Sequence, residues 1–236
     1  MATLGLARIL QLFVVQFGMG VFFIYLAGKI LSKNRSRLNI SLSLLYIFTA
    51  IGLFINVIYS LIFNEAIVVV LNFITNFSLM FALIFLLSTN LIILKSEMIF
   101  TKKYQITLAG TYAIALLLMI VFYPLGGGVS INESTDWAPV WHLPLFIYFI
   151  IIITSFCVVP ILYTAVKIYS KFEDEVLKKR WTYFIIGTVG LLIYLYGVYI
   201  NNLIDHPMAR FAFSLFDLTV FLWVYLIYYG IGRQIE

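Results

Sequence analysis

The sequence predicts an all-α, polytopic membrane protein: a bundle of seven transmembrane helices, with the N-terminus outside the cell and the C-terminus in the cytoplasm. Of the 236 residues, 64% are hydrophobic and 11% are charged, and the mean hydropathy is +1.08. Soluble domains carry about 25% charged residues. Seven apolar stretches each reach the roughly 20 residues that a spanning helix needs. They are residues 4–31, 39–63, 66–94, 105–124, 144–170, 181–204 and 208–230. We therefore expect a single domain, residues 1–236, in the cell membrane.

The positions of Lys and Arg predict the orientation of this bundle. Thirteen of the 15 basic residues lie in the C-terminal tail or in the links after the first, third and fifth helices, whereas Arg8 and Arg210 lie on the opposite side. Cytoplasmic loops are enriched in Lys and Arg, so these links are expected in the cytoplasm. The net charge of +5 then follows from topology and from attraction to anionic membrane lipids, and it requires no nucleic-acid partner.

The first three spans introduce polar residues into the bundle. The first span is too long for a signal peptide and lacks a small-residue cleavage site, so we expect it to remain as a helix. At 100° per residue, the small and polar residues of the second helix fall on one stripe, and the asparagines of the third share one face. They are Thr49, Gly52, Asn56 and Ser60 in the second helix, and Asn72, Asn76 and Asn90 in the third.

A long outer loop, residues 123–144, separates the fourth and fifth helices. Three glycines, residues 126–128, end the fourth helix. Trp137, Trp141 and His142 are expected at about headgroup level. We interpret them as an aromatic interface anchor, with a lid over a pocket as the alternative.

Two residues bear on modification and redox chemistry. Asn132 begins the glycosylation sequon Asn-Glu-Ser on the outer side of the membrane, where Asn132 is a candidate for glycosylation. Cys157 is the one cysteine of the chain and lies within the fifth helix. The sequence therefore predicts a buried, inert thiol, with neither a disulfide framework nor a thiol metal site.

A charged segment joins the fifth and sixth helices. Residues 167–181, KIYSKFEDEVLKKRW, contain neither Gly nor Pro. They can continue either helix into the cytoplasm as a charged elbow, with Glu173 and Asp174 near Lys178 at helical spacing. A solvated connector is the default expectation, and a docking surface for a cytoplasmic signalling partner is the sharper one. Pro160, within the fifth helix, predicts a kink.

The sixth helix carries a stripe of glycines. Gly187, Gly190 and Gly197 share a face with Tyr194 and Asn201. Glycines allow a neighbouring backbone to approach closely, so we assign the three of them to helix packing.

The seventh helix carries charge into the apolar part of the chain. Arg210, Ser214 and Asp217 lie on successive turns of one face. A carboxylate at the membrane centre costs about 2.5–3.5 kcal/mol, so Asp217 is expected to face inward and to have a partner or a proton.

Most of these polar residues fall in the outer half of the helices. The economical interpretation is an outward-facing polar cavity that accepts a small molecule or a lipid. The alternative is interhelical hydrogen bonding without a cavity, worth about 0.6 kcal/mol per contact. The predicted ligand-binding residues are Asp217, Arg210, Ser214, Asn72, Asn76, Asn56, Tyr194 and Asn201.

Several functional classes find no support in the residues. The sequence contains no HExxH motif, nucleophile elbow or carboxylate cluster, so we expect neither an enzyme nor a metal site. Four residues after Asp217, where microbial rhodopsins carry the retinal-binding lysine, stands Phe221. Both histidines, His142 and His206, lie in outer loops, so haem and other cofactors are not expected. A repeated half, which would suggest a transporter, is also missing.

Two stretches near the C-terminus carry a resemblance to a known family. KKRWTYFIIGTVGLLIYLYGVYINNL combines a basic cluster, an inner glycine and a long aliphatic run, and YLIYYGIGRQIE leaves the membrane in a basic turn. In these motifs and in topology the chain resembles the seven-helix sensor region of archaeal and bacterial histidine kinases and related signalling proteins. The resemblance implies a bundle that senses a ligand or a membrane state and passes the signal to an output domain. Because the sequence ends at Glu236 without such a domain, we expect either a separate cytoplasmic partner or a subunit that uses the same bundle without being a sensor.

Three hypotheses follow from the sequence. The first is a non-enzymatic sensor or receptor that binds a small molecule in the outer cavity. The second is an accessory or structural subunit of a larger membrane complex, which would use the glycine stripe to contact a partner subunit. The third is permeation of protons or small solutes past Asp217, which the sparsely polar inner half disfavours.

Overall fold

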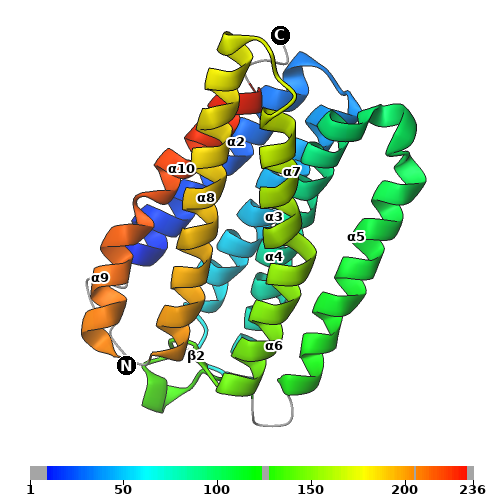
Figure 1. The fold of residues 1–236 in the computed structure, drawn as a ribbon. Helices are drawn as coiled ribbons and strands as arrows, with labels where there is room; N and C mark the ends of the chain where they lie inside the picture. Colours follow the sequence, from blue (N-terminus) through cyan, green and yellow to red (C-terminus); the bar gives the residue numbers. More distant parts are fainter. Residues whose placement is uncertain (1–9, 124–127, 205, 233–236) are drawn as a thin grey trace.

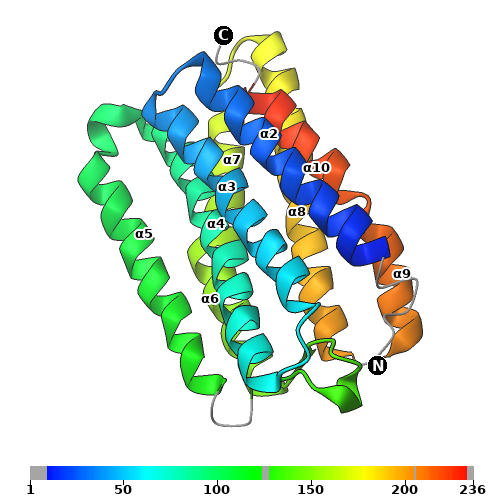
Figure 2. The same ribbon diagram turned by 180° about the vertical axis from the view of Figure 1, so that it is seen from behind.

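The computed structural model describes residues 10–123, 128–204 and 206–232. Its helices run up and down in one bundle, which Figures 1 and 2 show from opposite sides. Within the described residues, six helices are long and apolar enough to cross a membrane. They are Leu12–Lys33, Arg37–Tyr59, Glu65–Ile99, Lys102–Phe122, Leu143–Tyr169 and Glu175–Leu203. This architecture is that of an all-α, multi-pass membrane protein.

Polar N-caps mark where four of the helices begin. Each capping side chain accepts a hydrogen bond from a backbone N–H of the first turn, which has no partner within its own helix. The caps are Ser36 for α3 (Arg37–Tyr59), Asn64 for α4 (Glu65–Ile99), Thr101 for α5 (Lys102–Leu117) and Asp174 for α8 (Glu175–Leu203). The first helix, α2 (Phe17–Lys33), instead continues a π-helical segment, η1 (Leu10–Gln16).

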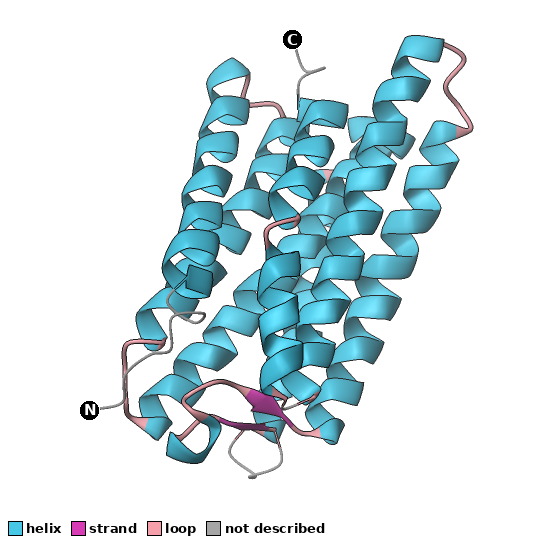
Figure 3. Ribbon diagram, turned by 90° about the vertical axis from the view of Figure 1, so that its left-hand side faces the viewer, coloured by secondary structure: helices cyan, strands magenta, loops and turns pink. Residues whose placement is uncertain are grey.

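The long outer loop folds into a small hairpin. Strands β1 (Val129–Ser130) and β2 (Val140–Trp141) pair antiparallel and enclose a 3₁₀ turn, η3 (Glu133–Thr135). Figure 3 shows these strands across one end of the bundle. We call this end the hairpin end. The opposite end, which carries the α2–α3, α4–α5 and α7–α8 turns, is called the basic end.

The interface-anchor interpretation is wrong for Trp141. Its side chain is 2% exposed and packs against Phe149 and Tyr199, with ring centroids 4.9 and 4.8 Å away. Trp137 packs against Phe63 at 5.5 Å, and the exposed His142 ring is 2.9 Å from the Ser130 hydroxyl. β2 leads directly into the helices, so Trp141 is drawn into the core.

The fifth span is built from three helical segments. They are α6 (Leu143–Ile153), the π-helical turn η4 (Thr154–Val158) and α7 (Val159–Tyr169). In η4 the Val159 N–H bonds to the Thr154 carbonyl, five residues back. This irregularity directly precedes Pro160, which has no N–H to donate. Cys157 lies within the turn and is fully buried, as predicted.

The charged elbow is a short turn followed by a helix. α7 ends at Tyr169 and α8 begins at Glu175, so the sixth helix is the one that is extended. The expected pairing of Glu173 and Asp174 with Lys178 is replaced by other contacts. The Asp174 carboxylate accepts the backbone N–H groups of residues 176 and 177 at 2.7 and 3.0 Å. Lys178 pairs with Glu175 at 3.6 Å.

The seventh apolar stretch is not one continuous helix. It consists of α9 (Pro207–Asp217), a turn at residues 218–219, α10 (Val220–Ile227) and the π-helical η5 (Tyr228–Gly232). The Thr219 hydroxyl stabilises the turn, because it donates to the Phe216 carbonyl at 2.8 Å and accepts from the Trp223 indole at 3.0 Å. Of this stretch, only Val220–Ile231 forms an apolar helix, and that helix is short.

The glycine stripe of α8 packs against this last segment. A Cβ added at Gly187 would lie 2.6 Å from the Trp223 carbonyl oxygen, and one at Gly190 would lie 2.3 Å from the Trp223 ring. At Gly197 it would lie 2.4 Å from the Phe213 ring. Figure 1 shows α8 alongside α9 and α10. The stripe is therefore covered by the chain itself, and an accessory subunit would need another surface to contact its partner.

Candidate functional site

A cavity of about 350 Å³ extends from the hairpin loop to about the middle of the bundle. Its walls come from η1, α2, α3, α4, α8, α9 and the first residue of α10, and part of its rim comes from the hairpin loop. Segments far apart in the sequence therefore meet around one space. Its volume is at the lower end of the range of about 300–1,000 Å³ for small-molecule sites.

Seven of the eight predicted ligand-binding residues line this cavity. They are Asn56, Asn72, Asn76, Tyr194, Asn201, Arg210 and Asp217. The eighth, Ser214, lies in α9, but its side chain falls outside the described residues. The structure thus brings the predicted set together, while binding of a ligand there stays a prediction.

Asp217 is the deepest charge of the site. It is the last residue of α9 and is 3% exposed. The Tyr194 side chain of α8 lies close to its carboxylate and interacts with it. The C-terminal end of a helix carries partial negative charge, which adds to that of the carboxylate. This part of the cavity therefore favours a cation or a hydrogen-bond donor.

Arg210 lies at the rim of the cavity. Its guanidinium donates to the Pro139 carbonyl of the hairpin loop at 3.4 Å, which connects α9 to the loop. Asp136 and Ala138 of the same loop also line the cavity. The loop thus occupies the position expected of a lid.

A buried hydrogen-bond cluster forms one wall of the cavity. The Asn72 amide donates to the Tyr59 hydroxyl at 3.1 Å, and the Asn76 amide donates to the Asn72 side-chain oxygen at 3.0 Å. The Tyr123 hydroxyl donates to the same Asn72 oxygen at 3.1 Å, and the Tyr199 hydroxyl donates to the Asn76 oxygen at 3.4 Å. Side chains from four segments therefore hold this wall in one arrangement.

Two further polar atoms in the cavity wall remain available to a ligand or to water. The Thr75 hydroxyl and the Asn201 side-chain oxygen are buried and have no hydrogen-bond partner among the described residues. A buried polar group without a partner costs about 1–3 kcal/mol. A bound molecule that donates to them would recover this free energy. On the facing wall, the Asn56 amide donates to the Gln16 side chain.

The part of the cavity farthest from the hairpin end is apolar. Leucines of α3, α4 and α8 line it together with Val220. The leucines are Leu45, Leu53, Leu79, Leu83, Leu191 and Leu195. The cavity thus combines polar and charged side chains, from Arg210 at the rim to the buried Asp217, with a leucine-lined wall, and this suits an amphipathic molecule.

Sequence reasoning missed several residues of the site. Thr75 lies three residues after Asn72, on the same helical face, and this spacing could have identified it. Tyr59, Tyr123 and Tyr199 gave no such signal, because a tyrosine near a helix end is equally typical of the membrane interface. Asp136 lies in the loop, where no periodicity indicates which side chains point inward.

Other predicted residues lie away from the cavity. The Asn90 amide donates to Thr164 and to the Ile161 carbonyl, both at 3.1 Å, and so joins α4 to α7. The Asn132 side chain caps η3 by accepting from the backbone N–H of Ser134 at 3.0 Å, and its glycosylation stays a prediction. Within the part of the chain that the structure describes, no group of three His, Cys, Asp or Glu side chains could hold a metal ion.

The fold and the cavity define a class, a multi-pass α-helical membrane protein with a cavity that both polar and apolar side chains line. Comparison with protein families finds no match for the sequence, and comparison with curated proteins finds no relative. Inference about the function therefore rests on the cavity.

Proposed function

We propose that the protein is a non-enzymatic, receptor-like membrane protein. It binds a small amphipathic molecule in the cavity and transmits binding to a partner at the opposite end of the bundle. The observation that carries the proposal is the meeting of polar residues from six segments around one cavity, with the Asp217 carboxylate at its depth.

The proposed orientation has seven crossings, with the hairpin end outside and the basic end in the cytoplasm. It is supported by the basic residues, 13 of 15 of which fall in the links assigned to the cytoplasm. In this orientation the cavity faces the exterior, and the seventh crossing is the broken segment α9–α10.

The ligand would place a positively charged or hydrogen-bond-donating group near Asp217 and Tyr194. Its apolar body would contact the leucine-lined interior, and its outer end would lie near Arg210. A carboxylate in low-dielectric surroundings favours a cation strongly, because water competes weakly there. An ammonium group or a similar donor is the group that best fits this position.

Transmission would pass through α8. This helix lines the cavity at Tyr194 and Asn201 and continues to the charged turn at the basic end. Its 29 residues span about 43 Å at 1.5 Å per residue. Its glycine stripe couples it closely to α10. A ligand that binds one arrangement of α8 and α9 more tightly would shift the population toward that arrangement.

Native mass spectrometry of the protein, purified gently from its own membrane, tests the binding proposal. We expect the wild type to carry a non-covalent adduct that the Asp217→Asn variant lacks. The matched control is Asp174→Asn, because asparagine also caps a helix well and residue 174 lies at the basic end. A wild type without any adduct, or one whose adducts are all retained by Asp217→Asn, would contradict the proposal.

The signalling part requires a second measurement. Partner proteins that co-purify with the wild type should be recovered in different amounts with Asp217→Ala, because the bound arrangement would be lost. If Asp217→Ala retains both the adduct and the partner at wild-type levels, Asp217 has only a structural role.

A further inference from the structure

We propose that a second site, independent of the cavity described above, binds one acyl chain of an anionic phospholipid. This site is an open groove of about 580 Å³ between α4, α5 and the η4–α7 segment. We call it the side groove. It lies in the half of the bundle nearest the basic end, away from the hairpin end.

The side groove lies beside the first part of α5, where residues 102–111 include no fully buried side chain. Near the hairpin end, Tyr112 donates to the Met80 carbonyl at 3.2 Å, and Tyr148 of α6 donates to the Ala115 carbonyl at 2.6 Å. Only 17% of the residues in the most apolar part of this span are buried, compared with 67% for α4. Figures 1 and 2 both show α5 at the rim of the bundle.

The walls of the side groove are mainly apolar. α4 contributes Leu87, Leu91 and Leu94, α5 contributes Leu108, and the facing segment contributes Phe156 and Pro160. Such walls bind a hydrocarbon chain through packing.

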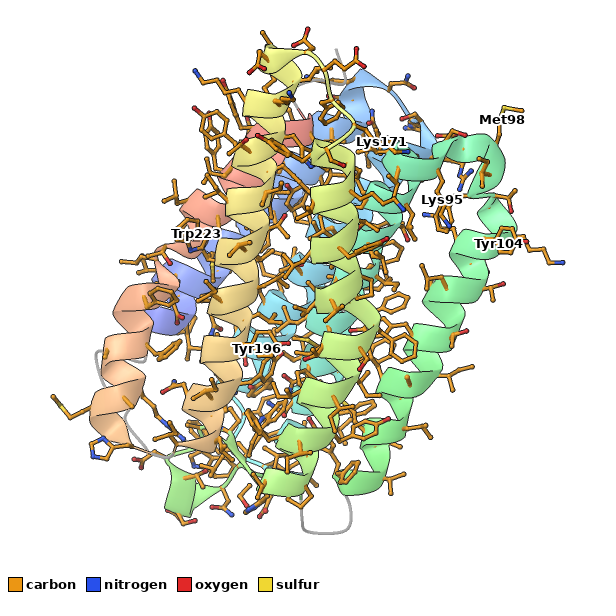
Figure 4. The ribbon with its side chains drawn as sticks, in the orientation of Figure 1. Lys95, Met98, Tyr104, Lys171, Tyr196 and Trp223 are labelled. Carbon is orange, nitrogen blue, oxygen red and sulfur yellow. The ribbon has the colours of Figure 1, made fainter. Side chains whose placement is uncertain are left out.

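Two lysines, Lys95 and Lys167, lie at the mouth of the groove near the basic end. The Lys167 ammonium is 3.4 Å from the Tyr163 hydroxyl and 5.5 Å from the centre of its ring, which keeps it beside the groove. Figure 4 labels Lys95 near the end of α4, beside the space between α7 and α5. No acidic side chain is among the described residues that line the groove. The mouth therefore attracts an anionic group such as a lipid phosphate.

The dimensions favour a lipid chain over a partner helix. From Lys95 to Leu87, and from Lys167 to Ser155 on the other wall, the groove extends roughly 12–18 Å at 1.5 Å per residue. This matches one leaflet, because the whole hydrocarbon core is about 30 Å thick. A partner helix that crosses the membrane would instead need a groove along the whole hydrocarbon thickness, about 30 Å.

Native mass spectrometry of the full-length protein, released from nanodiscs of stated composition, tests this proposal. The probes are phosphatidylglycerol and phosphatidylcholine, which share their acyl chains and differ in net charge. We expect the wild type to retain phosphatidylglycerol in preference to phosphatidylcholine. The double variant Lys95→Gln/Lys167→Gln should bind phosphatidylglycerol about tenfold more weakly, because each lysine near an anionic lipid contributes measurably to affinity.

Two further variants separate the groove from general surface charge. Lys171→Gln/Lys179→Gln removes two exposed lysines at the same end that do not line the groove, and it should leave affinity within about twofold. Leu91→Trp fills the groove without a change of charge and should also lose the lipid. Leu108→Trp fills the groove from the α5 side. It replaces Leu91→Trp in the experiment if Leu91→Trp lowers the melting temperature of the delipidated protein.

The possible results divide clearly. Equal retention of the two lipids by the wild type would overturn the proposal, as would an equal loss in the control pair, which would indicate surface charge alone. The proposal would also be overturned if the wild type had the mass of two chains and Leu91→Trp had the mass of one. A second copy of the chain would then occupy the groove. The proposal is supported if both the lysine variant and the groove-filling variants lose bound phosphatidylglycerol and the control pair retains it.

Discussion

At the scale of single residues, the close contact between α8 and α10 depends on the absence of a side chain at Gly187. Gly187→Ala places a Cβ 2.6 Å from a backbone oxygen of α10, so the two helices must separate. Overpacking of this kind costs about 1–3 kcal/mol. We expect a lower melting temperature in detergent, measured by thermal unfolding.

Gly110→Ala is the matched control for this prediction. A Cβ added at Gly110 meets no atom within 4 Å, and alanine is the better helix former by about 1 kcal/mol. Its melting temperature should therefore stay level or rise. If Gly187→Ala and Gly110→Ala have the same melting temperature, α10 does not pack against α8 as described.

Single residues also show where sequence reasoning reaches its limit. Asp217 was placed correctly facing the interior, because the cost of an exposed carboxylate in lipid leaves few other positions. Trp141 was predicted at the membrane interface but lies in the core, because tryptophan is typical of both positions. The contact of Arg210 with the Pro139 carbonyl could not be predicted, because Pro139 belongs to a loop whose path the sequence does not determine.

At the scale of elements, one arginine holds the turn between α4 and α5. The α4 helix extends to Ile99 through Ser96, which has a φ of 65° and so departs from helical geometry. The Arg37 guanidinium donates to the carbonyls of Glu97 and Phe100 at 3.1 and 2.8 Å, and to the Gln105 side chain at 3.2 Å. These three hydrogen bonds fix the turn against the start of α3.

We predict that Arg37→Gln releases this turn. Glutamine is too short to make the same contacts, so the backbone of residues 96–105 should exchange hydrogen faster, measured by mass spectrometry. Arg35→Gln removes a neighbouring exposed arginine and should leave this exchange unchanged. If the two variants behave alike, the hydrogen bonds of Arg37 do not hold the turn.

The helices were predictable, and so was an irregularity at Pro160, but two other interruptions were not. Long apolar runs indicate spans because the hydrocarbon core sets their length. Ser96 and the turn at residues 218–219 interrupt helices without a glycine or a proline, the usual signals. Thr219 stabilises its turn through contacts with Phe216 and Trp223, and such contacts exist only once the fold has formed. Propensity alone therefore predicts one continuous seventh helix.

At the scale of the whole molecule, the helices do not contribute equally to the two proposed sites. α4 contributes to both, with Asn72 in the cavity and Leu91 in the side groove. The polar faces indicated which residues share the cavity, because each helix must turn its polar side inward. Nothing in the periodicity predicts the side groove, which results from the angle at which α5 leaves the bundle.

The side of the membrane that the cavity faces depends on the orientation of the whole bundle. Labelling of single cysteines in intact cells measures this orientation. The background is Cys157→Ala, since Cys157 is buried within the fold and is the one native cysteine. His142→Cys and His206→Cys introduce exposed thiols at the hairpin end, and Lys171→Cys introduces one at the basic end. A membrane-impermeant maleimide should label the first two directly and the third only after permeabilisation.

The same experiment distinguishes six crossings from seven when a cysteine is appended after Glu236. If the α9–α10 segment crosses the membrane, this cysteine should behave like Lys171→Cys, in agreement with the positive-inside rule. If it is labelled in intact cells like His206→Cys, the broken segment returns to the side from which it started. A pattern reversed at every position would instead turn the Asp217 cavity toward the cytoplasm, where its ligand would be an intracellular molecule.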